Sequence, residues 1–287
     1  MRERILTGIV LVVVVLCCMF ASTNAIPMYL LMSMVAAVAG YEWYKLMPRS
    51  PHRMQSERRL RMKAATYGVL TLILSAAMMF TVAILDSKWV LLLIVAGVSF
   101  FWCCTVAWVK AYPKGDQVWY NSSLYFIGLL LIAGAVFAMN FLYLMSPWWL
   151  MYLFLLVWGA DSGAYFVGRK LGKRKLSPHV SPNKSVEGLY GGIATTVIIM
   201  SIAVAVSELH FNAWQWLCFL VVSILSVLAS VQGDLFESMV KRRAGIKDSG
   251  RILPGHGGVL DRVDSLLAAA PVFVMGIVIM LMLGVKL

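Results

Sequence analysis

Long runs of apolar residues, separated by short polar segments, make up most of this chain of 287 residues. A run of about 20 apolar residues is long enough for an α-helix to cross the hydrocarbon core of a bilayer. Because that core offers no water to backbone N–H and C=O groups, such runs fold as helices. The runs of sufficient length are 5–22, 26–46, 66–85, 89–109, 122–141, 147–167, 188–207, 213–232 and 264–284. The pattern therefore predicts an all-α, polytopic integral membrane protein with about nine transmembrane helices.

These runs leave little chain for a soluble domain, so we interpret 1–287 as a single membrane domain. Within it, 1–145 holds the N-terminal spans, and 146–287 holds the spans and cytoplasmic loops in which the polar residues cluster. The composition agrees, since 61% of the residues are hydrophobic and 13% are charged, whereas a soluble domain has about 25% charged residues. The first run resembles a signal peptide, but it is longer than usual and a second run follows at once, so we expect a retained helix.

The positive charges fix the expected orientation. The net charge is +12, and cytoplasmic loops of membrane proteins are enriched in Lys and Arg. If the N-terminus is cytoplasmic and the spans alternate, all of the 25 lysines and arginines except Lys88 and Lys286 fall on the cytoplasmic side. The sequence thus predicts a cytoplasmic N-terminus and a periplasmic C-terminus.

The first polar cluster lies inside a span, where Asp161 sits among small residues in GADSGAY. A carboxylate within the membrane is costly and is by default functional. The alternative is a packing residue that pairs with Lys or Arg of another helix.

The second polar cluster is the segment 169–188, RKLGKRKLSPHVSPNKSVEG. The positive-inside rule explains its basic first half but not its second half. Two Ser-Pro steps indicate rigid turns, and backbone N–H groups point outward at the start of the following helix. We therefore expect Ser177, Ser181, Asn183 and Lys184 to bind a phosphate.

The third polar cluster, 231–265, connects the last two spans. Asp234, Glu237, Ser238 and Lys241 recur at the spacing of one helical face, which indicates that the helix continues beyond its apolar run. The alternative is a solvated helix end without a function.

The glycine-rich stretch KDSGRILPGHGGVLDRVD follows at 247–264. Its glycines permit tight turns and close approach of the backbone to a ligand. Asp261 and Asp264 stand one helical turn apart at the start of the last span, with Arg262 beside them.

Carboxylates beside many Lys and Arg residues suit the binding of Mg²⁺ together with phosphates. The candidate metal ligands are Asp161, Asp234, Asp261 and Asp264. Zinc is disfavoured because the four histidines are scattered and none has zinc-ligand spacing with cysteine. Neither GxxxxGK[ST] nor a strand-based GxGxxG occurs, which excludes the ordinary soluble nucleotide-binding folds.

The stretch from Ser238 to Asp264 resembles the signature of the phosphatidate cytidylyltransferases, also called CDP-diacylglycerol synthases. The matching residues are Ser238, Lys241–Arg242, Lys247–Asp248, His256–Gly257–Gly258 and Asp261–Arg262–Val263–Asp264. The tracts DSGAYFVGRKLGK and LSPHVSPNKSVEG are also similar to that family. The resemblance covers the C-terminal half. The N-terminal half is similar only in its basic start and its succession of spans.

The resemblance implies transfer of CMP from CTP to phosphatidic acid, giving CDP-diacylglycerol and pyrophosphate. It implies Mg²⁺ dependence, with a second cation that can be monovalent, such as K⁺. It also implies a multi-pass protein of the bacterial inner membrane whose active site faces the cytoplasm. Membrane lipids and a second copy in a homodimer are the expected partners, and no nucleic acid is expected.

Under this interpretation the polar residues fall into two groups. The catalytic candidates are Asp234, Asp261, Asp264, Lys241, Lys247, Arg262 and His256. The candidates for substrate binding are Ser177, Ser181, Asn183, Lys184, Ser238, Arg242, Asp248, Gly257 and Gly258. A phosphate monoester is already ionised at neutral pH, so His256 is expected to donate a hydrogen bond to phosphate rather than act as a base. Its alternative role is to structure the loop.

Three other classes of protein share part of this pattern. A CDP-alcohol phosphotransferase would carry DGxxAR and two later aspartates four apart, a pattern that is absent. A polyprenol or dolichol kinase also uses CTP and aspartates, but the Lys-Asp and Asp-Arg-x-Asp spacing favours the cytidylyltransferase. A cation transporter could use Asp161 and Asp234 as ion ligands, but it would not need so many basic residues beside them.

The mechanism requires distant clusters to meet. Isolated carboxylates at Asp161 and Asp234 would be costly in lipid unless they share cations or basic partners. We therefore expect the sixth, eighth and ninth spans to pack together around a polar cavity that opens to the cytoplasm and sideways to the lipid leaflet.

Overall fold

The structure is a computed structural model that describes residues 2–47, 56–114, 123–207, 209–255 and 257–287. Helices make up almost all of it. In chain order they are α1 (Arg2–Leu16), its π-helical extension η1 (Cys17–Ala21), α2 (Ile26–Leu46), α3 (Glu57–Leu85), α4 (Lys88–Ala111), α6 (Ser123–Met145), α7 (Pro147–Leu171), α8 (Val186–Val206), α9 (Ala213–Arg243) and α10 (Leu260–Met282). Two strands, β1 (Lys175–Ser177) and β2 (Ser181–Ser185), lie between α7 and α8.

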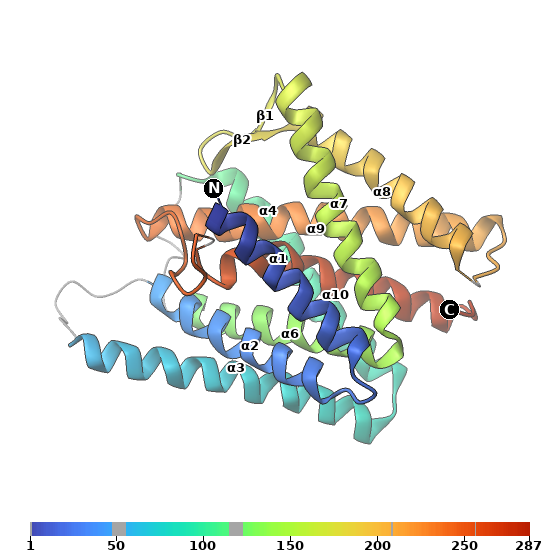
Figure 1. Ribbon diagram of the computed structural model, residues 1–287, viewed down its shortest axis with the longest axis horizontal. Helices are drawn as coiled ribbons and strands as arrows, with labels where there is room; N and C mark the ends of the chain where they lie inside the picture. Colours follow the sequence, from blue (N-terminus) through green and yellow to red (C-terminus); the bar gives the residue numbers. More distant parts are fainter. Residues whose placement is uncertain (1, 48–55, 115–122, 208, 256) are drawn as a thin grey trace.

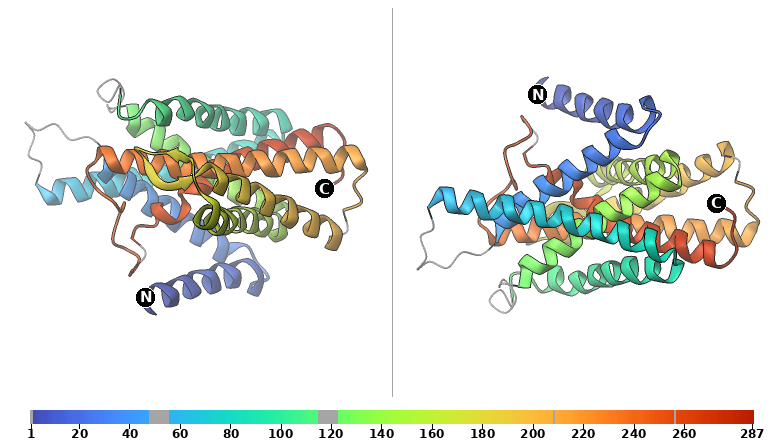
Figure 2. Two further views of the ribbon diagram at one scale, coloured as in Figure 1. Left: turned by 90° about the horizontal axis from the view of Figure 1, so that it is seen from above. Right: turned by 90° about the horizontal axis from the view of Figure 1, so that it is seen from below.

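The predicted polytopic all-α architecture is confirmed. In the described residues, eight helices, α2 to α10, are long and apolar enough to cross a membrane. The first expected span is a shorter apolar helix, Leu6–Ala21. It exposes many apolar side chains and stands apart from the main bundle (Figure 2).

Successive helices run in alternating directions along the bundle (Figure 1). The N-terminus, the β1–β2 hairpin and the α9–α10 connection therefore gather at one end, and the C-terminus lies at the other. Helices α6 and α10 are the most buried of the spans. The last helix thus runs through the centre of the bundle and carries its N-terminal aspartates to the end where the basic segments meet.

The helices near the site extend beyond their apolar runs. Helix α9 continues to Arg243, and α10 begins at Leu260. A helix pairs its own backbone N–H and C=O groups, and polar side chains in these extensions, such as Lys241 and Asp261, pair with each other. The one-face prediction for α9 is confirmed. Leu235, Phe236, Met239 and Val240 enter the apolar core, while the residues between them face the other way.

An aromatic cluster supports that inner face of α9. The Phe236 ring stacks on Trp43 of α2 at 6.2 Å between centroids and meets the edge of Trp102 of α4 at 5.7 Å. The indole N–H of Trp43 donates to the carbonyl of Leu124 in α6 at 3.0 Å. The N-terminal half is therefore the scaffold against which the site-bearing helix packs.

The segment 169–188 contains more regular structure than the turns that the sequence predicts. Strands β1 and β2 pair antiparallel, with Ser177 opposite Ser181. The tight turn between them is closed by the Val180 N–H, which donates to the Ser177 carbonyl at 3.3 Å. Val180 itself is buried, and this apolar anchor fixes the hairpin against the helices.

The opposite placement of the two chain ends leads to a prediction about topology. A reporter that is active only in the periplasm should be active when fused after Leu287 and inactive when inserted between α2 and α3, because Lys and Arg are retained on the cytoplasmic side. Enzyme assays on intact cells measure both fusions. Activity at the α2–α3 position would show that the protein has the opposite orientation in the membrane. Equal activity of the two fusions would show that the chain does not cross the membrane an odd number of times between the two positions.

Candidate active site

A cavity of about 490 Å³ lies where α7, α9 and α10 meet. Its acidic lining residues are Asp161, Asp234, Asp248, Asp261 and Asp264. Its basic lining residues are Lys241, Arg242, Lys247 and Arg262. Ser238 and Ser265 add hydroxyl groups. The predicted packing of the sixth, eighth and ninth spans around one polar cavity is confirmed.

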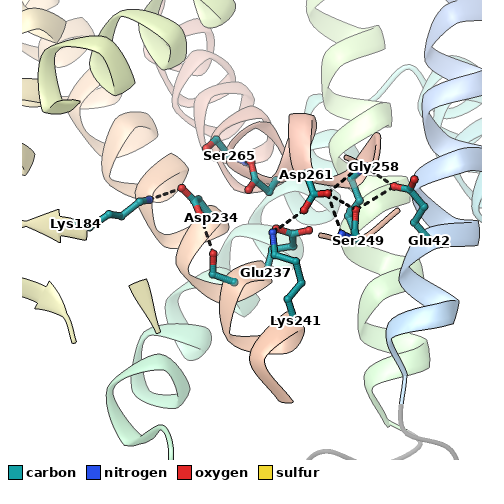
Figure 3. Close-up of polar contacts among 12 residues, drawn as sticks. Glu42, Lys184, Asp234, Glu237, Lys241, Ser249, Gly258, Asp261 and Ser265 are labelled. Carbon is teal, nitrogen blue, oxygen red and sulfur yellow. Dashed lines mark hydrogen bonds and ion pairs between the residues drawn. The ribbon is translucent and has the colours of Figure 1, made fainter. Parts of the chain in front are cut away.

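The hairpin contributes a cation to one wall of this cavity. Lys184 of β2 pairs with Asp234 of α9, with 2.5 Å between Nζ and Oδ2, and both side chains meet in Figure 3. The other carboxylate oxygen of Asp234 accepts from the Ser238 hydroxyl at 3.1 Å. Asp161 of α7 lies within electrostatic range of Lys184 and Asp234. The hairpin lysine therefore pairs with a carboxylate of α9, beside a cavity that Asp161 of α7 also lines.

A second lysine joins α9 to α10. The ammonium group of Lys241 lies 2.5 Å from Glu237 Oε2 and 2.6 Å from Asp261 Oδ1, and all three side chains are buried or nearly so. The helices can come this close because Gly233 has no side chain, since a Cβ there would lie 2.4 Å from the Asp264 carbonyl oxygen. Asp264 lies one helical turn beyond Asp261 on α10 and lines the same cavity as Asp234.

The remaining oxygen of Asp261 organises the glycine-rich connection. Asp261 Oδ2 accepts hydrogen bonds from Ser249 N at 2.9 Å, Ser249 Oγ at 3.0 Å and Gly258 N at 2.8 Å. Charge-assisted hydrogen bonds of this kind are about twice as strong as neutral ones. Asp261 thus holds both ends of the 249–258 loop to the first turn of α10.

Glu42 of α2 completes this arrangement from the N-terminal half of the chain. It is 1% exposed, and its Oε2 accepts from Leu260 N at 2.8 Å. The same oxygen lies 3.2 Å from Ser249 Oγ, whose single proton it shares with Asp261 (Figure 3). The N-cap residue of α10 makes no side-chain cap of its own, so Glu42 supplies from another helix the acceptor that a helix N-terminus needs. A Cβ at Gly258 would lie 2.5 Å from the same oxygen, which explains why a glycine follows His256–Gly257.

The sequence pattern does not single out Glu42 or Ser249, and it places Glu237 on the helical face of α9 without a role. Glu42 lies near the end of an apolar run, in AGYEWYKL. The rule that singled out Asp161, an acidic residue within a span, would have found it. Its partner could not be read from the pattern, because Glu42 and Leu260 are 218 positions apart.

The predicted site residues of the hairpin lie in different places, and only one of them lines or contacts the acidic cavity. Lys184 reaches the acidic cavity. Ser177 lines a separate, mostly apolar cavity beside Lys110 and His179. Ser181 and Asn183 line neither of these cavities, so a role for these three in substrate binding stays a prediction.

Most of the predicted residues of the α9–α10 region lie at the site. Ser238, Arg242, Lys247, Asp248 and Arg262 line the acidic cavity. Gly257 and Gly258 lie in the loop that Asp261 holds, where Gly257 has a positive φ of 83°. His256 lies outside the described residues, so its predicted contact with phosphate stays a prediction.

The donor set fits Mg²⁺. The carboxylates of Asp161, Asp234 and Asp264 are hard oxygen donors around one cavity. Within the ranges that the structure describes, no three Asp, Glu, His or Cys side chains are close enough to hold an ion by themselves. Mg²⁺ takes one or two carboxylates from a protein and completes its coordination shell with water and substrate phosphate. Asp261 is the least available of the predicted ligands, because one of its oxygens pairs with Lys241 and the other accepts from Ser249 and Gly258. Both oxygens of Asp234 are also engaged, but each has a single partner, Lys184 or Ser238.

Comparison with known proteins decides the family. The sequence profile of the cytidylyltransferase family matches residues 2–280. The chain belongs to the cytidylyltransferase family. It is 36% identical over 295 residues to a phosphatidate cytidylyltransferase of Haemophilus influenzae, covering 95% of this chain and 97% of the relative. It is 38% identical over 279 residues to one of Pseudomonas aeruginosa, covering 95% of each. A phosphatidate cytidylyltransferase of Bacillus subtilis is 41% identical over 153 residues, which are 50% of this chain and 56% of the relative.

Family membership confirms the resemblance seen in the C-terminal signature. The protein is accordingly a nucleotidyltransferase and a multi-pass membrane protein. The profile also covers the N-terminal half, which the sequence alone links to the family only by its basic start and its succession of spans.

The cap that Glu42 provides can be tested by substitution. Glu42→Ala should lower the thermal unfolding midpoint of the detergent-solubilised protein, because a buried N–H without a partner costs about 1–3 kcal/mol. Glu42→Gln keeps an acceptor oxygen and should recover most of the loss. The matched control is Glu57→Ala, since Glu57 forms an exposed ion pair with Arg61, a type that contributes at most about 1 kcal/mol. Equal midpoints for Glu42→Ala and Glu57→Ala would show that the cap is unimportant.

Proposed function

We propose that this protein is a phosphatidate cytidylyltransferase, which transfers CMP from CTP to phosphatidic acid and releases pyrophosphate. The observation that carries the proposal is the mixed lining of the acidic cavity. Val157, Trp158 and Leu266 give this cavity apolar lining residues, while Arg242 and Lys247 add positive charge. Such a cavity suits a lipid phosphate that meets a water-soluble nucleotide. The names of the relatives in Haemophilus influenzae and Pseudomonas aeruginosa support the same reaction.

We propose Mg²⁺ as the cofactor, with Asp161, Asp234 and Asp264 as the carboxylates that would hold it. A bound divalent ion, with a second cation such as K⁺, would neutralise charge on the reacting phosphates. The remaining chemistry falls to the protein's own residues. Lys184 would leave Asp234 for a substrate phosphate, since a lysine ammonium can exchange one anion for another by rotating its flexible stem.

The basic residues bring two anionic substrates together. Arg242 and Arg262 reach into the cavity from α9 and α10, where they would hold and orient phosphate oxygens. The nucleophile is a phosphate oxygen of phosphatidate, which is already ionised at neutral pH, so no general base is needed. Catalysis then depends on positioning and on electrostatic stabilisation of the developing charge.

We propose that the site faces the cytoplasm of a bacterial inner membrane. The gathering of the hairpin and the α9–α10 connection at the end that carries the N-terminus supports this orientation (Figure 1), as does the bacterial origin of the relatives. Phosphatidate would enter from the leaflet with its acyl chains in the bilayer, and CTP would enter from water. The homodimer implied by the family resemblance stays a prediction.

The assignment predicts a defined set of products. The purified protein, supplied with CTP labelled in the cytidine, phosphatidate and Mg²⁺, should form a labelled lipid and release one pyrophosphate for each labelled lipid. Thin-layer chromatography and a pyrophosphate assay measure the two products. Phosphorylated lipid with release of CDP would identify a lipid kinase, and a lack of turnover would favour a transporter.

The same assay tests the carboxylates. Asp234→Asn should reduce turnover by at least about 10²-fold, as loss of a preorganised electrostatic group does. Asp248→Asn is the comparison variant, with a smaller expected effect, because Asp248 lies in the connection rather than on the α9–α10 face. An Asp234→Asn protein with near-normal turnover would remove Asp234 from the proposed metal site.

A further inference from the structure

A second cavity of about 630 Å³ adjoins the acidic one. Lys247, Asp248 and Arg262 line both cavities, so these three side chains form a shared wall. The rest of the second cavity is lined by the glycine-rich connection, including Arg251. A volume of this size can hold a small polyanion or a nucleotide.

The charge of the second cavity favours an anion. Lys247, Arg251 and Arg262 face it, against one acidic residue, Asp248. Within the described residues, neither Lys247 nor Arg251 forms an ion pair. Unpaired cations around a concave surface attract and hold anions.

The second cavity lies on the aqueous side of the acidic one. Among the described residues, its one contribution from a spanning helix is Arg262, in the first turn of α10. Part of its lining comes from the turn at Leu253–Gly255, where Leu253 N donates to the Gly257 carbonyl at 3.0 Å. The hydroxyl of Thr7 in α1 donates to the Pro254 carbonyl at 3.1 Å, which supports this turn from outside. The acidic cavity, by contrast, includes apolar residues of the membrane-spanning helices.

The geometry of phosphoryl transfer connects these observations. The attacking and leaving oxygens lie roughly in line on opposite sides of the transferred phosphorus. If phosphatidate attacks from the acidic cavity, the leaving group must depart on the far side, across the shared wall. We propose that the second cavity binds the β- and γ-phosphates of CTP and receives the released pyrophosphate, with Arg251 as a binding residue. This inference rests on the proposed function.

The proposed step balances without a further reactant. A phosphate oxygen of phosphatidate forms a bond to the α-phosphorus of CTP. The bond from that phosphorus to the oxygen bridging the α- and β-phosphates breaks, and its electron pair leaves on pyrophosphate. The leaving group gains negative charge, which the cations of the second cavity stabilise.

Arg251→Ala tests the proposal. Arg251 lines the second cavity but not the acidic one. The variant should raise both the KM for CTP and the inhibition constant of pyrophosphate by about tenfold, since each loses a charge-assisted contact. The KM for phosphatidate should stay unchanged. The control is Lys170→Ala, which removes one exposed positive charge outside both cavities and should alter none of these constants.

Two results would overturn the inference. One is an Arg251→Ala variant that behaves like Lys170→Ala. The other is an equal rise in the KM values of both substrates, which would indicate general attraction of anions rather than a pyrophosphate site. Failure of the proposed function is a separate outcome, seen as a wild-type protein that does not convert CTP. In that case the thermal shift of wild type and Arg251→Ala with pyrophosphate and Mg²⁺ decides the inference, and equal shifts reject it.

Discussion

The ion pairs that Lys241 makes with Glu237 and Asp261 join the two helices on which the candidate site is built. These charges lie out of water, where a cation without its partners would be very costly. The contact therefore sets the relative positions of α9 and α10. Through the second oxygen of Asp261 it also sets the course of the loop between them. Asp234 and Asp264, one on each helix, face a common cavity as a consequence.

The N-terminal half of the chain is more than a membrane anchor for these helices. Glu42 caps α10 at the point where the loop enters it, and Trp43 of the same helix packs against Phe236 on the inner face of α9. One turn of α2 thus supports both site-bearing helices, by a hydrogen bond on one side and by aromatic packing on the other. Substitutions in α2 are therefore expected to change the geometry of the site even where the substituted residue does not contact a substrate.

The sequence was informative where a single segment determines its own structure. Apolar length located the spans, and helical spacing placed Asp234 and Lys241 on one face of α9. The signature around Asp261 and Asp264 indicated the chemistry of the site. Contacts between distant segments could not be predicted in this way. The pairing of β1 with β2 depends on a turn anchored by buried Val180. The cap on α10 depends on a residue of α2, since helix capping from another helix leaves no local spacing to detect.

The central claim is that Lys241 and Asp261 act as one buried unit, and a double-mutant cycle tests it most directly. Thermal unfolding would be measured for the wild type, Lys241→Met, Asp261→Asn and the double variant in one detergent. Lys241→Met leaves Glu237 and Asp261 buried without their cation, a loss of about 3–5 kcal/mol for a buried ion pair. Asp261→Asn should cost less, because Lys241 keeps its contact with Glu237. The account predicts that the double variant loses clearly less stability than the sum of the two single losses. Additive losses would contradict it, because the two residues would then stabilise the protein independently.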